Sequence, residues 1–199
     1  ASHLGEGSNA WLYYADRLME FPTALLGVAL ATVLVPTLSK AFAEDRRDDY
    51  SRMLDWGLRL VCLIALPAAL GLGLLAEGLI AVLFQGGKFG ARDVAQTAMA
   101  LVGYAVGLLG LIAVKILAPG FYVPQPGWGR FLLKLAVALA ALAVLLWFAG
   151  REIDWIALHA RWLLRAGLLA AVIAAAMAVY FGLLWVLGFR PRDFLLKMR

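Results

Sequence analysis

Three ionisable residues lie close together inside a long apolar stretch near the start of the chain: Asp16, Arg17 and Glu20. Side chains three and four residues apart share a helix face, so Glu20 is expected beside both Arg17 and Asp16. A charge inside a bilayer costs at least about 2.5 kcal/mol on insertion scales and persists where it faces another charge or a water-filled cavity. A guanidinium in such a cavity can bind a phosphate through two parallel hydrogen bonds. The cluster is therefore a candidate anion-binding site.

A structural role for the same residues is the alternative. They could form an ion pair near the outer interface, with Arg17 extending toward the lipid headgroups. From Arg17 to Lys40 the chain advances 23 residues. In a helix this is about 35 Å, which exceeds a hydrocarbon core of about 30 Å. We therefore expect Arg17 toward the outer end of a span, where a bound ligand would be an anion partway across the membrane.

The overall composition indicates a lipid environment. Of the 199 residues 64% are hydrophobic and only 16% charged, and the mean hydropathy is +0.85. A soluble domain of this size needs more polar surface, whereas a protein in a bilayer can be as apolar outside as inside. The net charge of +5 comes from residues in short loops and at helix ends. We read them as topology signals, and we expect no nucleic-acid partner.

Five apolar segments are long enough to cross a hydrocarbon core, which requires about 20 helical residues. A further run at 77–84 is too short to span and predicts a short interfacial or re-entrant helix. Pro22, Pro36 and Pro67 fall inside or at the ends of these segments, where bends are expected. The fold class is thus all-α, a polytopic helical membrane protein. The predicted spans are 11–43, 48–75, 92–118, 128–149 and 160–187.

The positions of basic and aromatic residues predict the orientation. Lys and Arg accumulate in cytoplasmic loops, and Trp and Tyr at both interfaces. The loop between the first and second predicted spans and the C-terminal tail are both rich in basic residues. With five spans, these two segments lie on the same side of the membrane. We therefore expect the N-terminus outside and the C-terminus in the cytoplasm. The basic residues of the first loop are Lys40, Arg46, Arg47 and Arg52, and those of the C-terminal tail are Arg190, Arg192, Lys197 and Arg199. The opposite side, which has fewer basic residues for its loops, carries Lys88, Arg92, Arg151, Arg161 and Arg165. The aromatic residues near span ends are Trp11, Tyr13, Tyr14, Trp128, Trp147, Trp155 and Trp162.

Several ordered runs resemble the MurJ/MviN family of lipid II flippases. The longest is WLYYADRLMEFP at 11–22, which contains the charged cluster. The resemblance covers nearly the whole chain, but it corresponds to only the C-terminal half of such a protein. The other runs are LGVAL at 26–30, PTLS at 36–39, LDWGLR at 54–59, LFQGGKF at 83–89 and KILAPGFY at 115–122.

The resemblance implies the fold of the multidrug/oligosaccharidyl-lipid/polysaccharide exporter superfamily, with two MATE-like lobes around a central cavity. Residues 1–122 then correspond to the first three spans of the C-terminal lobe with the short helix at 77–84, and 123–199 to the last two spans and a basic cytoplasmic tail. Family members continue through two further spans after the position of Tyr122. We expect the missing N-terminal lobe to be a partner that completes the cavity.

The resemblance further implies transport by alternating access across the bacterial inner membrane. The substrate would be lipid II, the undecaprenyl-pyrophosphate-linked peptidoglycan precursor, or a similar polyprenyl-pyrophosphate glycolipid, with membrane lipids around the protein. Arg17 matches a cavity arginine of the family and is expected to bind the pyrophosphate or peptide carboxylates, with Asp16 and Glu20 orienting it. Lys115 is a further candidate for substrate binding, although extension toward the interface also explains it.

Two other function classes stay open. An exporter of another polyprenyl-linked oligosaccharide or of a cationic drug would depend on a carboxylate rather than on Arg17. A membrane scaffold without transport would be favoured if the chain were stable and partner-bound without flipping lipid. We expect neither an enzyme nor a cofactor, because no nucleophile set, metal spacing or dinucleotide fingerprint is present. The mixed charges at 44–52 predict a solvated loop in which Asp48 or Asp49 caps the next helix.

Overall fold

The computed structural model describes residues 8–29, 35–120 and 128–189, and every regular element within these ranges is a helix. The all-α class is therefore confirmed. The elements are α1 (Ser8–Ala29), α2 (Val35–Ala43), α3 (Arg47–Leu74), α4 (Ala76–Phe84), α5 (Ala91–Gly120), α6 (Trp128–Glu152), the 3₁₀ helix η2 (Ala157–Arg161) and α7 (Trp162–Val186).

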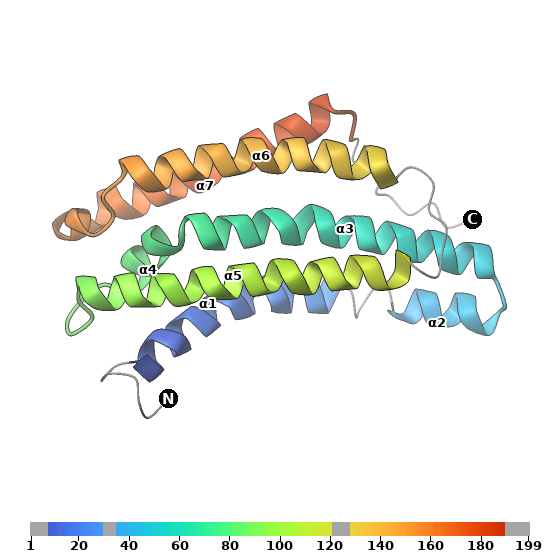
Figure 1. The fold of residues 1–199 in the computed structure, drawn as a ribbon, viewed down its shortest axis with the longest axis horizontal. Helices are drawn as coiled ribbons and strands as arrows, with labels where there is room; N and C mark the ends of the chain where they lie inside the picture. The colour runs from blue at the N-terminus through green and yellow to red at the C-terminus, as the bar shows by residue number, and fades with distance from the viewer. Residues whose placement is uncertain (1–7, 30–34, 121–127, 190–199) are drawn as a thin grey trace.

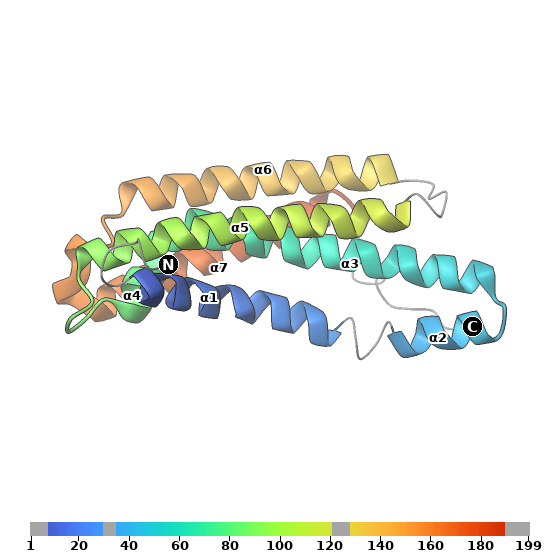
Figure 2. The ribbon, with the colours of Figure 1, turned by 60° about the horizontal axis from the view of Figure 1, so that its bottom comes forward.

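The helices form an elongated bundle with α3 at its centre (Figure 1). On one side of α3, α5 packs against both α3 and α1, and on the other side α6 packs against α3 and α7. Figure 2 shows α1 and α6 on opposite sides of α5. Helix α3 thus connects the first helices of the chain with the last two.

Within the described ranges, three helices are long and apolar enough to cross a membrane, judged by length and composition: α3 with 28 residues, and α6 and α7 with 25 each. The polytopic character is thereby supported, and the count of five spans stays a prediction. Helix α5 has 30 residues, and the first predicted span contains two helices, α1 with 22 residues and α2 with 9. Residues 30–34 between them lie outside the described ranges. The short apolar run forms α4, as predicted.

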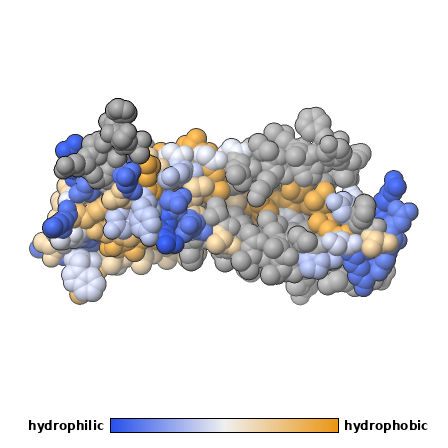
Figure 3. All heavy atoms as spheres, turned by 90° about the horizontal axis from the view of Figure 1, so that it is seen from below, coloured by the Kyte–Doolittle hydropathy of each residue, from blue (hydrophilic) through white to orange (hydrophobic). Residues whose placement is uncertain are grey.

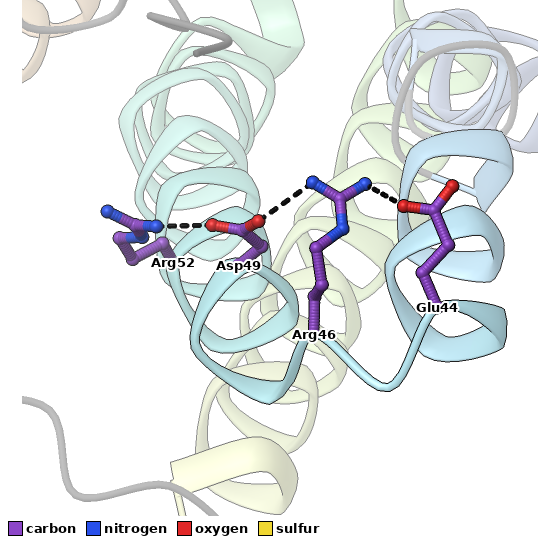
Figure 4. Close-up of polar contacts among 4 residues, drawn as sticks. All are labelled: Glu44, Arg46, Asp49 and Arg52. Carbon is purple, nitrogen blue, oxygen red and sulfur yellow. Dashed lines mark hydrogen bonds and ion pairs between the residues drawn. The ribbon is translucent and has the colours of Figure 1, made fainter.

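A network of ion pairs occupies the turn between α2 and α3 (Figure 4). The Arg46 guanidinium bridges Glu44 and Asp49, with 2.9 Å between its Nη1 and the Asp49 carboxylate, and Arg52 pairs with the same carboxylate. Asp45 adopts φ 49° at the end of α2. The polar end is also seen in Figure 3, where hydrophilic residues gather at the α2–α3 turn and a smaller hydrophilic group lies over α1.

The expected helix cap at this turn is wrong. Helix α3 begins at Arg47 and its N-cap residue is Arg46, which makes no capping hydrogen bond through its side chain. Asp48 and Asp49 instead lie in the first turn of α3. A carboxylate there still stabilises the helix, because it lies near the positive end of the helix dipole.

At the end of the bundle opposite the α2–α3 turn, α4 packs closely against the segment that follows α6. The Trp155 side chain is 1% exposed and covers Gly78 of α4 so closely that a Cβ at that position would lie 2.9 Å from the indole ring. The assignment of Trp155 to an interfacial aromatic belt is therefore wrong. Its ring is buried because residue 78 has no side chain, which lets α4 approach the segment after α6.

We predict that Gly78→Ala destabilises the protein by about 1–3 kcal/mol, because the added methyl group overlaps the Trp155 ring. Gly71→Ala is the matched control, since a Cβ at that helical position meets nothing within 4 Å. Denaturant titration in detergent micelles gives both free energies of unfolding. Equal stability of the two variants would contradict the packing described.

Candidate functional site

The charged cluster lies on the side of α1 that faces away from the bundle. Ala15 is fully buried, and Leu18 and Met19 pack against the core. Because side chains advance by about 100° per residue, Arg17 and Glu20 must then point in the opposite direction. Their side chains are 58% and 56% exposed.

The structure brings Arg17 and Glu20 together and adds a third partner, Tyr13. Arg17 Nη1 lies 3.0 Å from Glu20 Oε2, and Arg17 Nε donates a hydrogen bond of 3.2 Å to the Tyr13 hydroxyl. The guanidinium carbon is 5.4 Å from the centre of the Tyr13 ring, a cation–π distance. Two of the three guanidinium nitrogens therefore have fixed partners. Asp16 is exposed on the same face.

This arrangement orients the guanidinium without enclosing it. In the described residues, the hydrogen bonds of Arg17 involve Nε and Nη1, which leaves the edge carrying Nη2 available to an acceptor outside the chain. A phosphate oxygen suits this position, because Arg presents a planar set of donors with fixed geometry. The local contacts are compatible with both the ligand site and the structural ion pair.

Contacts at the N-terminal end of α1 fix its position. Trp11 Nε1 donates a hydrogen bond of 2.8 Å to Asp93 Oδ1 at the start of α5, and the other oxygen of Asp93 accepts from the Gly90 backbone. The Tyr14 ring packs against Phe84 and Phe89, with ring centres 4.6 and 5.4 Å apart. These contacts attach α1 to the turn between α4 and α5 and thereby set the direction of Arg17.

Lys115 is not part of the same cluster. Helices α1 and α5 start at the same end of the bundle (Figure 1), and the Trp11–Asp93 hydrogen bond places those two residues at one level. Arg17 follows Trp11 by six residues and Lys115 follows Asp93 by 22. At 1.5 Å per residue their backbones are about 24 Å apart along the axis. The side chain of Lys115 lies outside what the structure describes.

Asp55 and Arg165 make contacts between helices that the sequence did not predict. Asp55 Oδ1 accepts a hydrogen bond of 2.5 Å from Trp128 Nε1, while its second oxygen lies 2.9 Å from Arg59 Nε. Arg165 is only 3% exposed and donates to the Gln85 side-chain oxygen at 2.5 Å. Arg165 lies in the first turn of α7, at a helix end as expected, but its burial was not predicted. Among the described residues, no group of three or more potential metal ligands is present.

Comparison with known proteins identifies the family. A profile of the family described as "Lipid II flippase MurJ" matches residues 1–186. The chain belongs to this family.

Several relatives share substantial sequence identity. A protein named lipid II flippase MurJ from Burkholderia cenocepacia is 39% identical over 250 residues, which cover 96% of this chain and 48% of the relative. Proteins named probable lipid II flippase MurJ are 46% identical over 125 residues in Vibrio cholerae and 48% over 122 residues in Buchnera aphidicola. These two matches cover 63% and 61% of this chain, and 24% of each relative. The chain thus spans about half the length of the Burkholderia relative.

The length of the Burkholderia match carries further information. It extends over 250 aligned positions, although this chain has only 199 residues in total. The aligned region of the relative is therefore longer than this chain by roughly fifty positions or more in total, which equals the length of two spans of about 20 residues with their connections. The absence of two family spans, which we expect after Tyr122, stays a prediction.

We predict that Trp11→Phe speeds amide hydrogen exchange in the N-terminal half of α1 by about fivefold, because it removes one hydrogen bond worth about 1 kcal/mol. Trp147→Phe is the control, since that ring is 49% exposed on α6. Exchange measured by mass spectrometry in nanodiscs distinguishes them. An unchanged rate in Trp11→Phe would show that this hydrogen bond does not hold α1.

Proposed function

We propose that this chain forms part of a lipid II flippase of the bacterial inner membrane, in which Arg17 binds the pyrophosphate of the substrate. Family membership supports the transport function, and the open Arg17–Glu20–Tyr13 cluster supports the site. In this proposal the C-terminus is cytoplasmic and a second lobe, supplied from outside this chain, faces the cluster. Transport involves no covalent step.

The observation that carries the proposal is the placement of charge on an uncovered helix face. Arg17 and Glu20 are more than half exposed, although the residues around them are apolar. Exposure of such groups to acyl chains costs several kcal/mol, whereas exposure to a water-filled cavity between two lobes does not. The polar face of α1 therefore favours a cavity on this side of the bundle.

The Arg17–Glu20 ion pair also suits alternating access, because Arg17 can exchange Glu20 for another anionic partner. Glu20 neutralises Arg17 when the site is empty, and an incoming pyrophosphate competes for the same guanidinium. A contact that differs between two states is what a ligand needs in order to shift the equilibrium between them. Asp16, on the same exposed face, would repel an anion and keep binding reversible. Lys115 is too distant to contact the same phosphate group and would act at a different stage of the passage.

We predict that Arg17→Gln weakens binding of undecaprenyl pyrophosphate to the chain in nanodiscs by roughly tenfold to a hundredfold, because one charge-assisted set of hydrogen bonds is lost. Arg47→Gln is the matched control, since its side chain is 92% exposed at the opposite end of the bundle. Native mass spectrometry gives both affinities. Equal affinities would reject Arg17 as the phosphate ligand.

Transport is tested in the complete Burkholderia cenocepacia relative. Replacement of its residue aligned with Arg17 by glutamine is expected to abolish growth of cells depleted of their own flippase, while the protein still accumulates in the membrane. Replacement of the residue aligned with Arg47 is expected to preserve growth. Normal growth of the first variant would contradict the proposed mechanism.

A further inference from the structure

Pro67 interrupts the hydrogen bonding of the central helix. Helix α3 continues on both sides of this residue, from Arg47 to Leu74. Within a helix, each backbone oxygen accepts from the N–H four positions later, and proline has no N–H. The backbone oxygen of Leu63 therefore lacks the partner that any other residue at position 67 would supply. An unpaired backbone oxygen is costly inside a membrane, because water is not available there to replace the missing donor.

Helix α7 supplies the missing hydrogen bond. The Tyr180 hydroxyl donates to the Leu63 backbone oxygen at 2.7 Å, and Tyr180 is only 2% exposed. A buried phenol needs an acceptor for its own proton, and a regular helix offers none, because its backbone oxygens are already paired. Pro67 frees an acceptor on α3 at the level of this hydroxyl. The two groups therefore satisfy each other across the bundle.

The contact depends on the position of α7 along its axis. The backbone of α7 packs against α6, η2 and α4, and the long Tyr180 side chain extends from it to α3. A shift of α7 by two residue positions, about 3 Å, would lengthen the contact to about 4 Å, which is beyond hydrogen-bonding range. A small movement of α7 is therefore enough to leave the Leu63 oxygen without a donor.

Helix α6 contacts α3 on both sides of Pro67. Before the proline, Trp128 donates a hydrogen bond to Asp55. After it, α6 approaches the end of α3 so closely that a Cβ at Gly150 would lie 3.1 Å from the Leu74 backbone oxygen. The hydroxyl contact from α7 lies between these two positions along α3. Together, α6 and α7 therefore extend across the proline and can fix the angle between the parts of α3 that precede and follow it.

We propose that Tyr180 is a positioning residue that fixes the bend of α3 at Pro67, so that the angle of the central helix depends on the position of α7. A proline inside a helix bends it and removes a hydrogen bond that would resist further bending. While the hydroxyl is bound to Leu63, the angle is held. When α7 moves away, α3 is free to change its angle. Because α1 packs against α3 and α5, the face that carries Arg17 is connected to this bend.

The first test removes the hydroxyl and keeps the ring. Tyr180→Phe is compared with Tyr104→Phe on α5, a half-buried tyrosine whose hydroxyl makes no hydrogen bond within the described residues. Amide hydrogen exchange of the full chain in nanodiscs, measured by mass spectrometry, follows the turn of α3 that contains Pro67. We expect exchange there to be about threefold to tenfold faster in Tyr180→Phe, the effect of one interhelical hydrogen bond, and unchanged in Tyr104→Phe. Equal rates in the two variants would overturn the proposal.

The second test asks whether the proline is the reason for the contact. Pro67→Ala restores a backbone N–H that donates to the Leu63 oxygen within α3. In this background we expect Tyr180→Phe to speed exchange by less than about twofold, because the hydroxyl is no longer the replacement donor. The same acceleration in both backgrounds would show that Tyr180 acts through packing alone and would overturn the proposal. Neither measurement uses a ligand of Arg17, so its outcome is independent of the proposed transport.

Discussion

The rotational setting of α1 determines what its charged residues can do. One residue of slip would turn the helix by about 100° and move Arg17 from the open face toward the core. Two contacts fix the rotation of α1: Ala15 is buried against the bundle, and Trp11 donates a hydrogen bond to Asp93. The aromatic contacts of Tyr14 add to this constraint. Because the apolar face is determined by packing, the position of the guanidinium on the opposite face follows without any contact of its own to the remaining helices.

Polar contacts between helices explain why α6 and α7 pack against the first part of the chain in one specific arrangement. Lipid tails are as apolar as leucine side chains, so burial of apolar surface does not select one partner helix over another in a bilayer. Hydrogen bonds between helices and close approach of their backbones select the partner helix instead. Trp128 at the start of α6 donates to Asp55 of α3, and the Tyr180 hydroxyl of α7 donates to the Leu63 backbone oxygen at 2.7 Å. At the other end, Arg165 of α7 donates to Gln85, next to α4. These contacts join both ends of the final pair to the first part of the chain.

The sequence predicted what depends on local pattern and failed on contacts between distant residues. Apolar run length was sufficient to place a helix at 48–75, where α3 occupies Arg47–Leu74, and to recognise α4 as too short to span. Residue spacing also predicted the Arg17–Glu20 pair, because partners three residues apart meet through helix geometry alone. The buried contacts of Arg165 and Trp155 were not predicted, because their partners, Gln85 and Gly78, lie more than seventy residues away. No periodicity within a single segment contains that information.

Two of the uncovered surfaces in the described part of the chain have opposite chemistry, and this limits what can cover each of them. The face of α1 carries an ion pair and a phenol, whereas an open groove between α5 and α6, beside Met99 and Trp147, is lined mostly by apolar and small residues. Helices α1 and α6 lie on opposite sides of α5 (Figure 2), so a single neighbouring helix cannot cover both the charged face of α1 and the groove beside α6. A water-filled cavity is compatible with the first surface and would leave the second unfavourably hydrated, while a packed helix is compatible with the second and would bury the charges of the first. The bundle therefore presents one polar surface and one apolar surface, with α5 between them.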